Sequence, residues 1–569
     1  MQENKKDKTM SVMARLFALL LFGGLFACSP GDPGTNEGTA SDTSAATAAA
    51  DGNPPEAETP PNILFIVADD IGFTDIEAFG GEIATPNLDR LAYGGLRLNN
   101  LHAAPACRNT RLMMMSSAGT VAANHPLPEA SRGGVLSLSY ATIPELLQDA
   151  GYATYGAGKW DLGNVSGYTP ADRGFDRSWM QLGGSSSYFA EYLFAGRVLG
   201  FEDNGRTVEL GELPDDFYVT KHYTDKMLEY LRSTEEGTPW FAYMPYTAPH
   251  WPLQLPDDWL DRYAGRYDDG YDALRARRFE QATEAGVLPP GSNLDNFQPV
   301  AEPWADLSPD EQRRYSRAQE IFAGMVEYFD MSVGRVIDYL EESGQLDNTV
   351  IVFSADHGAS GGEHGVDTGR GPQGGGGPTL PDHIDNSLEN FGRPGSFIDH
   401  GRGFGEAATA PFKYQKGSLD EGGLRAAAIV HYPAAVEAGG VSNAFMTMMD
   451  FLPTFLEIAG TEHPGAGPYR NGREINDIVG RSAWPYLTGE APTIHSSTDS
   501  AGWATGGGTG ALIRGDHKII NRPPPGGGMG PTQWRLYDLA ADPGERRDIS
   551  AENPELTAEL VAEWATNWR

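Results

Sequence analysis

Short, almost wholly apolar runs alternate along the chain with amphipathic segments, and several of these runs end in charged residues. The stretches 61–70, 239–250 and 348–358 have the composition of strands that are buried on both faces of a sheet. Helical periodicity extends furthest between Ile321 and Leu340, where apolar side chains trace one face. The alternation of such strands with helices predicts an α/β fold with a large, mostly parallel central sheet flanked by helices.

Smaller elements fill the intervals between these segments. Thr85 is the expected N-cap of a helix, because proline stands at the first helical position and glycine at the end. A second helix is predicted within 142–151, and it leads into a strand at 152–159. Residues 358–400 are rich in glycine and proline and predict a long surface excursion near the functional site. The segment 510–545 predicts a small C-terminal antiparallel unit.

The N-terminal part of the chain has the pattern of a targeting segment. In residues 1–28, basic residues precede an apolar run that is too short for a permanent membrane helix and that ends at Cys28. This pattern predicts a lipoprotein signal peptide with lipid on Cys28; an ordinary cleaved signal is the alternative. Residues 29–60 lack large apolar groups and predict a disordered tether. We therefore expect an exported protein of the periplasm or cell envelope, anchored through Cys28.

Charge and cysteine content narrow the range of partners. The 42 basic and 78 acidic residues give a net charge of −36, which should repel nucleic acid and anionic membranes. An anionic substrate would therefore need a local cationic pocket, and membrane contact is expected only through the lipid anchor. With Cys28 lipidated, Cys107 has no disulfide partner. Cys107 is then either a small buried hydrophobe or a reactive group.

Polar residues cluster in sequence where predicted strands end. Asp69 and Asp70 follow the first strand, and Asp356 and His357 follow the strand at 348–355. Adjacent carboxylates suit a hard divalent cation, although a single pair is more often a cap or a turn. Three further candidates lie at or just beyond strand or loop ends: Lys159, His250 and Lys416.

An ordered series of segments resembles the type I sulfatases. These segments include "PNILFIVADDIGFTDIEAFGGEIATPNLDRLA", "GYATYGAGKWDLG", "FAYMPYTAPHWPLQLP", "LDNTVIVFSADHG" and "LYDLAADPGE". The resemblance covers roughly residues 60–569 and is greatest to bacterial arylsulfatases of the alkaline-phosphatase-like superfamily. It implies an alkaline-phosphatase-like fold, with a sulfatase catalytic domain over 61–460 and a C-terminal subdomain over 461–569 that completes the pocket.

The resemblance also implies a chemistry for the lone thiol. Cys107 and Arg111 match the first and last positions of the family's C-x-P-x-R motif. There the cysteine is oxidised by a maturation enzyme to formylglycine (3-oxoalanine), whose hydrated aldehyde attacks the sulfur of a sulfate monoester. One hydroxyl forms a covalent sulfo-enzyme, and the second then expels sulfate. The expected substrates are aryl sulfates or sulfated sugars.

The other candidates receive roles from the same resemblance. Asp69, Asp70, Asp356 and His357 would hold Ca²⁺, with Mg²⁺ as the alternative. Arg111 and Lys159 would steady the diol. His250 and Lys416 would stabilise or protonate the leaving oxygen.

Two departures from the family pattern fall at chemically important positions. Asn109 replaces the proline of C-x-P-x-R, which weakens the match to what the maturation enzyme reads. The usual "GKWHLG" is "GKWDLG", so Asp161 stands where relatives use histidine to remove the second proton of the diol. A carboxylate can accept this proton, but its reference pKa is about two units lower than that of histidine.

Three functions are consistent with these observations. The first is a sulfuric ester hydrolase. The second is a catalytically impaired surface lipoprotein that binds sulfated ligands, which the two departures would favour. The third is a phosphonate monoester or phosphodiester hydrolase of the same superfamily, because tetrahedral anions of sulfur and phosphorus differ little in size.

Overall fold

A mixed sheet lies at the centre of the molecule. The structure is a computed structural model that describes residues 60–126, 134–190, 200–295, 297–366, 384–523 and 532–569. Parallel strands form the middle of the sheet, in the spatial order β10 (Thr349–Ala355), β1 (Asn62–Ala68), β9 (Trp240–Pro245), β5 (Ala153–Lys159) and β6 (Arg177–Gln181). Every residue of β1, β9 and β10 is buried, which explains their continuous apolar sequences.

The two margins of this sheet are antiparallel or mixed. On one side β11 (Arg425–His431) runs antiparallel to both β10 and β2 (Leu96–His102), while β12 (Gly440–Ser442) and β13 (Met446–Thr447) pair parallel with β2. On the other side β7 (Phe201–Asp203) and β8 (Arg206–Val208) are antiparallel. The predicted mostly parallel α/β sheet is therefore confirmed, with its antiparallel strands at the edges.

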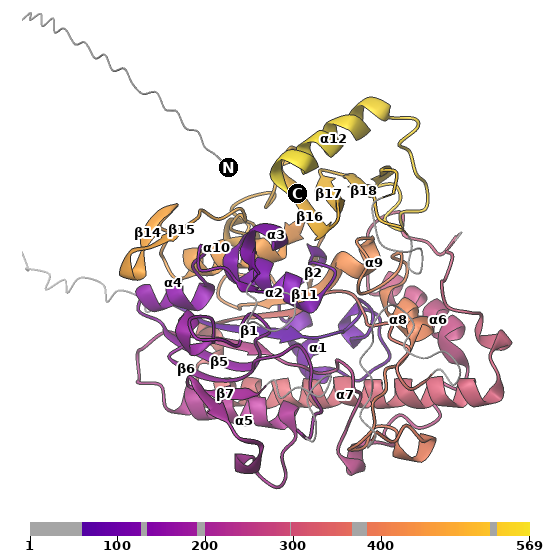
Figure 1. Cartoon of the computed structure of the whole chain (residues 1–569), viewed down its shortest axis with the longest axis horizontal. Helices are drawn as coiled ribbons and strands as arrows, with labels where there is room; N and C mark the ends of the chain where they lie inside the picture. Colours follow the sequence, from indigo (N-terminus) through magenta and orange to yellow (C-terminus); the bar gives the residue numbers. More distant parts are fainter. Residues whose placement is uncertain (1–59, 127–133, 191–199, 296, 367–383, 524–531) are drawn as a thin grey trace, which may run out of the picture. The chain divides into compact units, whose positions relative to one another are not determined.

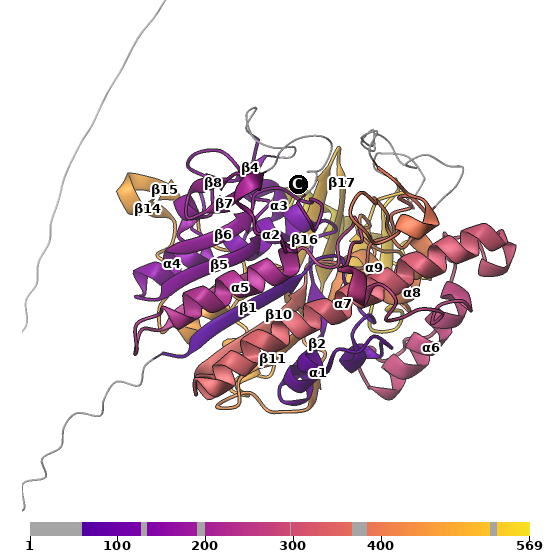
Figure 2. The same ribbon diagram turned by 90° about the horizontal axis from the view of Figure 1, so that it is seen from below.

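Helices cover both faces of the sheet. Figures 1 and 2 show α5 (Val219–Arg232), α7 (Pro309–Glu342) and α1 (Pro86–Tyr93) on one face, and α4 (Ile143–Asp149), α10 (Phe451–Ile458) and α2 (Cys107–Ser116) on the other. Aromatic pairs fix these layers: Phe65 of β1 lies 5.2 Å from Phe455 of α10 between ring centroids, and Phe353 of β10 lies 6.2 Å from Phe329 of α7. Apolar side chains on both faces thus hold the strands in place.

The helix starts follow local sequence signals, with one difference. Thr142 and Glu145 form a reciprocal capping box at the start of α4. Helix α1 begins at Pro86, as predicted. Thr85, however, makes no side-chain capping bond to α1, because its hydroxyl accepts a hydrogen bond of 3.0 Å from the backbone N–H of Glu77.

A separate antiparallel sheet of four strands lies near the C-terminus. Its strands are β16 (Ser500–Gly506), β17 (Thr509–Arg514), β18 (His517–Ile520) and β19 (Arg535–Asp538), and α12 (Pro554–Asn567) packs on it. Trp564 of α12 donates a hydrogen bond of 2.8 Å to the carbonyl of Trp503. The predicted C-terminal antiparallel sheet is confirmed, with β16 and α12 as additions.

A buried ionic cluster links this sheet to the main part of the fold. Lys518 of β18 bonds the carboxylates of Glu421, in α9 (Glu421–Leu424), and of Glu545, at 2.8 and 2.9 Å. Glu421 also accepts from Arg425 at 2.8 Å and pairs with His102 Nε2 at 2.9 Å. The side chains of Lys518, Glu421 and Glu545 are fully buried. Each charge is therefore compensated within the protein.

The predicted surface excursion at 358–400 is found only in part, because Asp385, Ser387 and Glu389 are exposed whereas both ends of the segment are buried. His400 is fully buried, stacks on Phe322 at 4.3 Å and pairs with Gln319 at 2.8 Å. Gly and Pro content indicates turns, but tertiary packing decides burial. Residues 367–383 lie outside the described ranges, as do the predicted signal peptide and almost all of the tether.

The remaining elements are short or peripheral. They are α3 (Thr120–Ala123), α6 (Gly270–Glu284), α8 (Arg402–Thr409), α11 (Trp484–Leu487), β3 (Asn124–His125), β4 (Val135–Leu136), β14 (Gly467–Tyr469) and β15 (Arg473–Ile475). Within the described ranges, none of the helices combines the length and apolar character needed to cross a bilayer.

Candidate active site

The carboxyl ends of adjacent parallel strands meet at one edge of the central sheet. Asp69 follows β1 and Asp356 follows β10, and the preceding residues of the two strands, Ala68 and Ala355, are in register. Lys159 is the last residue of β5. Ligand sites in parallel sheets are expected at this edge. The strand order therefore brings together residues that are almost 300 positions apart.

Cys107 lies at the N-terminus of α2, inside this group. Its Sγ is 3.3 Å from Asp69 Oδ1 and 3.2 Å from His357 Nε2, and the residue is 8% exposed. Thr110 fixes the start of the helix, because its hydroxyl accepts from the N–H of Ala104 and donates to the carbonyl of the same residue. The thiol thus lies at hydrogen-bonding distance from both strand-end groups.

Two buried cations hold the Asp69 carboxylate from the other side. Arg111, one helical turn after Cys107, donates to Asp69 Oδ2 at 3.3 Å and to the carbonyl of Lys159 at 2.9 Å. The Lys159 ammonium donates to the same Asp69 oxygen. Arg111 Nη2 also lies 3.5 Å from Asp356 Oδ2. All of these side chains are fully buried.

Asp70 gathers the remaining candidates. Lys416 donates to Asp70 Oδ1 at 2.5 Å, and the Nε2 atoms of His250 and His357 each lie 3.6 Å from this carboxylate. Lys416 comes from the loop before α9. Two backbone hydrogen bonds anchor this loop: Lys416 N–H donates to the carbonyl of Ala359, and Gly417 N–H donates to the carbonyl of Pro105. The backbone of Asp70 has a φ of 70°. This left-handed conformation is uncommon for a residue with a Cβ and turns the chain sharply at the strand end.

Charge balance within the site favours an anion once a cation is bound. Five groups that carry or can carry positive charge face three carboxylates and one thiol; the five are Arg111, Lys159, His250, His357 and Lys416. Burial would raise the pKa of Asp69, but the charges of Lys159 and His250 hold it well below its usual value. Burial and the neighbouring Asp69 charge raise the pKa of Asp356 to about 7.

The same cations act on the thiol. Burial would raise the pKa of the Cys107 thiol, but the positive charges of Lys159 and Lys416 hold it well below its ordinary value. Burial would lower the pKa of His357, whereas the charge of Asp356 raises it to about 9. Such surroundings favour the thiolate, which is the form in which a cysteine reacts.

The donor set fits a divalent cation. Ligand atoms of Asp69, Cys107, Asp356 and His357 all lie within 4.8 Å of one another. Asp70 Oδ2 is buried and accepts no hydrogen bond from any residue that the structure describes. His357 Nδ1 lies 2.8 Å from the carbonyl of the following residue, which presents Nε2 to the cluster. Carboxylate oxygens dominate the set, and hard cations such as Ca²⁺ and Mg²⁺ prefer these donors.

Asp161 lies apart from the sulfur contacts and forms an ion pair with Arg108. Arg108 Nη2 donates to Asp161 Oδ1 at 2.7 Å, and Nη1 donates to the carbonyl of Gly134 at 2.6 Å. The two side chains are 15% and 8% exposed. The other carboxylate oxygen of Asp161 makes no hydrogen bond within the described residues. The pair therefore joins the residue after Cys107 to the loop that follows Lys159.

Arg108 is a site residue that sequence reasoning missed. A signal for it exists in the sequence, because an arginine directly follows Cys107 in the same chain that has aspartate in place of histidine at 161. Opposite charges at two motif positions, Arg108 and Asp161, suggest a pair, but only the fold shows that they meet.

Comparisons with known proteins give one consistent result. Residues 61–461 match the family model described as Sulfatase. An uncharacterized sulfatase of Schizosaccharomyces pombe is 36% identical over 535 residues, with 89% of this chain and 92% of that protein covered. An arylsulfatase of Klebsiella aerogenes is 32% identical over 412 residues, which are 71% of this chain and 87% of that protein. A crystal structure of i-CgsB bound to a neocarrahexaose aligns with a TM-score of 0.62 at 22% identity, over 90% of this chain and 94% of that one.

Proposed function

The chain belongs to the sulfatase family and is an enzyme that hydrolyses sulfate esters, and on that premise we propose that it cleaves sulfate monoesters with a formylglycine made from Cys107 and a bound divalent cation. One observation carries this proposal: the Cys107 sulfur lies 3.3 Å from Asp69 and 3.2 Å from His357, within the donor cluster. Metal and nucleophile would then act on the same sulfate group.

The cation would be held by Asp69, Asp70, Asp356 and His357, with Ca²⁺ as the first choice and Mg²⁺ as the second. When both groups are present, formylglycine supplies a hydrated aldehyde that attacks sulfur and the cation polarises a sulfate oxygen. Lys159 keeps Asp69 ionised by donating to its Oδ2.

The leaving oxygen would be served by His250 and Lys416. His250 Nδ1 lies 2.6 Å from the carbonyl of Trp251, so this nitrogen carries a proton and Nε2 faces the site. Burial would lower the pKa of His250, but the charge of Asp70 raises it. A protonated Nε2 can stabilise or protonate an alkoxide or phenolate as it departs.

Asp161 would accept a proton from position 107 through the oxygen that is not bonded to Arg108. Its Oδ1 is occupied by the guanidinium at 2.7 Å. Arg108 thus serves as a positioning residue, because it orients the carboxylate without touching the reacting atoms.

The test is hydrolysis of 4-nitrophenyl sulfate by protein exported from a host that has the maturation enzyme, in buffers with calcium or with magnesium. Peptide mass spectrometry shows whether residue 107 has lost sulfur and two hydrogens and gained one oxygen. Activity that depends on this conversion, on the cation and on Cys107 supports the proposal. The Cys107→Ala variant is the matched control, and 4-nitrophenyl phosphate and a phosphonate ester are the comparison substrates. An unmodified Cys107 in inactive protein would support the ligand-binding alternative instead.

The proposal extends to location. The segment before residue 60 would direct export, and Cys28 would carry lipid. Fractionation of the expressing cells, together with the Cys28→Ser variant, tests this: the variant should move from the membrane fraction to the soluble envelope fraction.

A further inference from the structure

A cavity of about 430 Å³ lies directly beside the candidate active site. Lys416 lines it, and the ammonium group of the same residue donates to Asp70 at 2.5 Å. Its size falls in the range of about 300–1,000 Å³ that is usual for small-molecule sites. A substrate whose sulfate occupies the site would therefore extend its leaving group into this space.

Two arginines with uncommitted side chains line the same cavity. Arg402 is the first residue of α8, and Arg522 follows β18; both are partly buried. Over the described ranges, neither guanidinium donates a hydrogen bond or forms an ion pair. By contrast, the buried Arg278 elsewhere in the fold bonds two carboxylates. A half-buried guanidinium without a partner is unfavourable unless a ligand supplies one.

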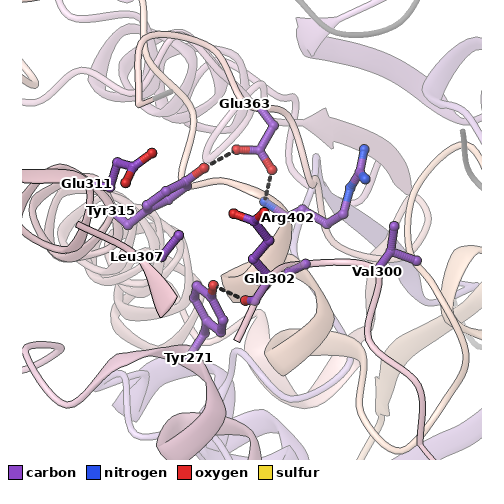
Figure 3. A pocket seen from close by; sticks show the side chains of 10 residues that line it. Tyr271, Val300, Glu302, Leu307, Glu311, Tyr315, Glu363 and Arg402 are labelled. Atoms are coloured by element: carbon purple, nitrogen blue, oxygen red, sulfur yellow. Dashed lines mark hydrogen bonds between the residues drawn. The ribbon is translucent and has the colours of Figure 1, made fainter. Parts of the chain in front are cut away.

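The nearby carboxylates are already occupied by other groups. Glu363 accepts from the Tyr315 hydroxyl and from the backbone N–H of Arg402. Figure 3 shows this arrangement, with the Arg402 side chain extending away from Glu363 in the direction of Val300. Glu406 lines the cavity and accepts from the backbone N–H of Val300 at 2.7 Å. Both carboxylates attract Arg402 at longer range. Neither of them bonds its guanidinium.

The remaining lining groups suit a ring rich in hydroxyl groups. Trp251 and Tyr414 supply aromatic surface, and Gln415 supplies amide groups. Gly361 leaves room for Gln415, because a Cβ at Gly361 would lie 1.5 Å from its Nε2 atom. Polar and aromatic groups together with two guanidinium groups form a lining that differs from a purely apolar aryl pocket.

We propose that this cavity binds a saccharide leaving group and that Arg402 and Arg522 bind a second anionic group on that saccharide, a sulfate or a carboxylate. The proposal rests on the sulfatase activity proposed above and assigns its substrate class. Guanidinium groups match the planar or tetrahedral oxygens of both anions through paired N–H donors. The preferred substrate is therefore a sulfate monoester of an anionic saccharide rather than an aryl sulfate whose leaving group carries no further charge.

The test compares a substrate that has one charged group with substrates that have two. We would measure kcat/KM for a monosulfated hexosamine, for the same sugar with two sulfates, and for a sulfated disaccharide that contains a uronic acid. The enzyme without substitutions should prefer the substrates that carry a second charge. In Arg402→Gln and Arg522→Gln, the ratio of doubly to singly charged substrate should fall about tenfold each, mainly through KM. Comparison of the disulfated sugar with the disaccharide that contains a uronic acid distinguishes a site for sulfate from a site for carboxylate.

Arg313→Gln is the matched control, because Arg313 is exposed and, among the described residues, pairs only with Asp310 on the helix surface. Both test variants should fold, since the side chains they remove make no hydrogen bond to the described part of the chain. Unchanged ratios in both variants would overturn the proposal.

A binding measurement separates this proposal from the proposed activity. In a Cys107→Ala background, which prevents turnover, calorimetry with the disulfated sugar should show binding that Arg402→Gln or Arg522→Gln weakens about tenfold. If these substitutions weaken binding and the enzyme that retains Cys107 shows no hydrolysis, the cavity is upheld and the proposed activity is rejected. Equal binding by all variants would reject the cavity whatever the activity.

Discussion

Replacement of Asp161 by asparagine separates its two possible roles. The Asp161 carboxylate accepts a hydrogen bond from Arg108 at 2.7 Å through Oδ1, and its side chain is 8% exposed. An asparagine keeps an oxygen at this position, so Arg108 retains an acceptor. An ion pair becomes a hydrogen bond from the guanidinium to a neutral amide, which should lower the free energy of unfolding by only about 1 kcal/mol. Loss of a general base should lower kcat by about 10²–10⁴-fold.

The assay measures kcat for 4-nitrophenyl sulfate on protein in which the conversion of Cys107 has been verified by mass. Urea unfolding of the same samples gives the change in stability. Asp268→Asn is the control, because Asp268 is exposed and lies away from the site. An Asp161→Asn enzyme that keeps most of its kcat would refute the base role and leave Asp161 as an anchor for Arg108.

The ion pair also predicts how a histidine at this position would behave. Asp161→His alone removes the carboxylate that pairs with a guanidinium only 15% exposed, so stability should fall by about 1–3 kcal/mol and turnover should not rise. The double variant Arg108→Ser/Asp161→His removes the guanidinium charge as well. We expect it to recover the stability and to exceed the single variant in kcat, because the two substitutions are coupled. Additive effects of the two changes would contradict the coupling.

Three further predictions concern stability and cation dependence. Lys518→Met should lower the free energy of unfolding by about 3–5 kcal/mol, because it leaves Glu421 and Glu545 buried without their shared cation; an unchanged urea midpoint would contradict this. Burial lowers the pKa of His222 to about 4, so the unfolded chain binds more protons than the folded chain between about pH 6.5 and 4. The free energy of unfolding therefore decreases as the pH is lowered through this range. His222→Phe should therefore remove about 1–2 kcal/mol of the loss between pH 7 and 5, measured by urea unfolding at both pH values. Chelation of divalent cations should abolish hydrolysis of 4-nitrophenyl sulfate, and calcium should restore it; full activity in chelator would argue against the cation.

The central strands could be predicted from the sequence because they are buried on both faces. Their apolar runs leave little doubt about type, and the acidic residues at their ends locate the edge where a site forms. Strand β2 carries arginine, two asparagines and histidine among its seven residues, so its sequence does not read as a buried run. Its polar groups are satisfied by distant partners, such as the carbonyl of Val287 for Asn99. Such partners cannot be read from local pattern.

The candidate site was predictable in its members and not in its internal contacts. Lys416 lies in a loop without periodicity, so its position marked it as a candidate while only the resemblance to a family gave it a role. The Arg108–Asp161 pair and the uncommitted guanidinium groups of Arg402 and Arg522 depend on how loops meet. Turn-rich sequence at 358–400 predicted a solvent-facing segment, whereas packing places His400 in the interior. A sequence pattern describes one segment at a time, whereas these features arise where several segments of the chain meet.

The ionic cluster around Lys518 has a consequence for how this chain can be divided. The match to the family model ends at residue 461, and a boundary there would suggest a detachable tail. Truncation at that point would remove Lys518 and Glu545 and would expose Glu421 and Arg425 to solvent. Glu421 begins α9, the short helix that follows the Lys416 loop. Chimeras between homologues should therefore exchange β18 together with the α9 region, because the buried charges of each segment are compensated by those of the other.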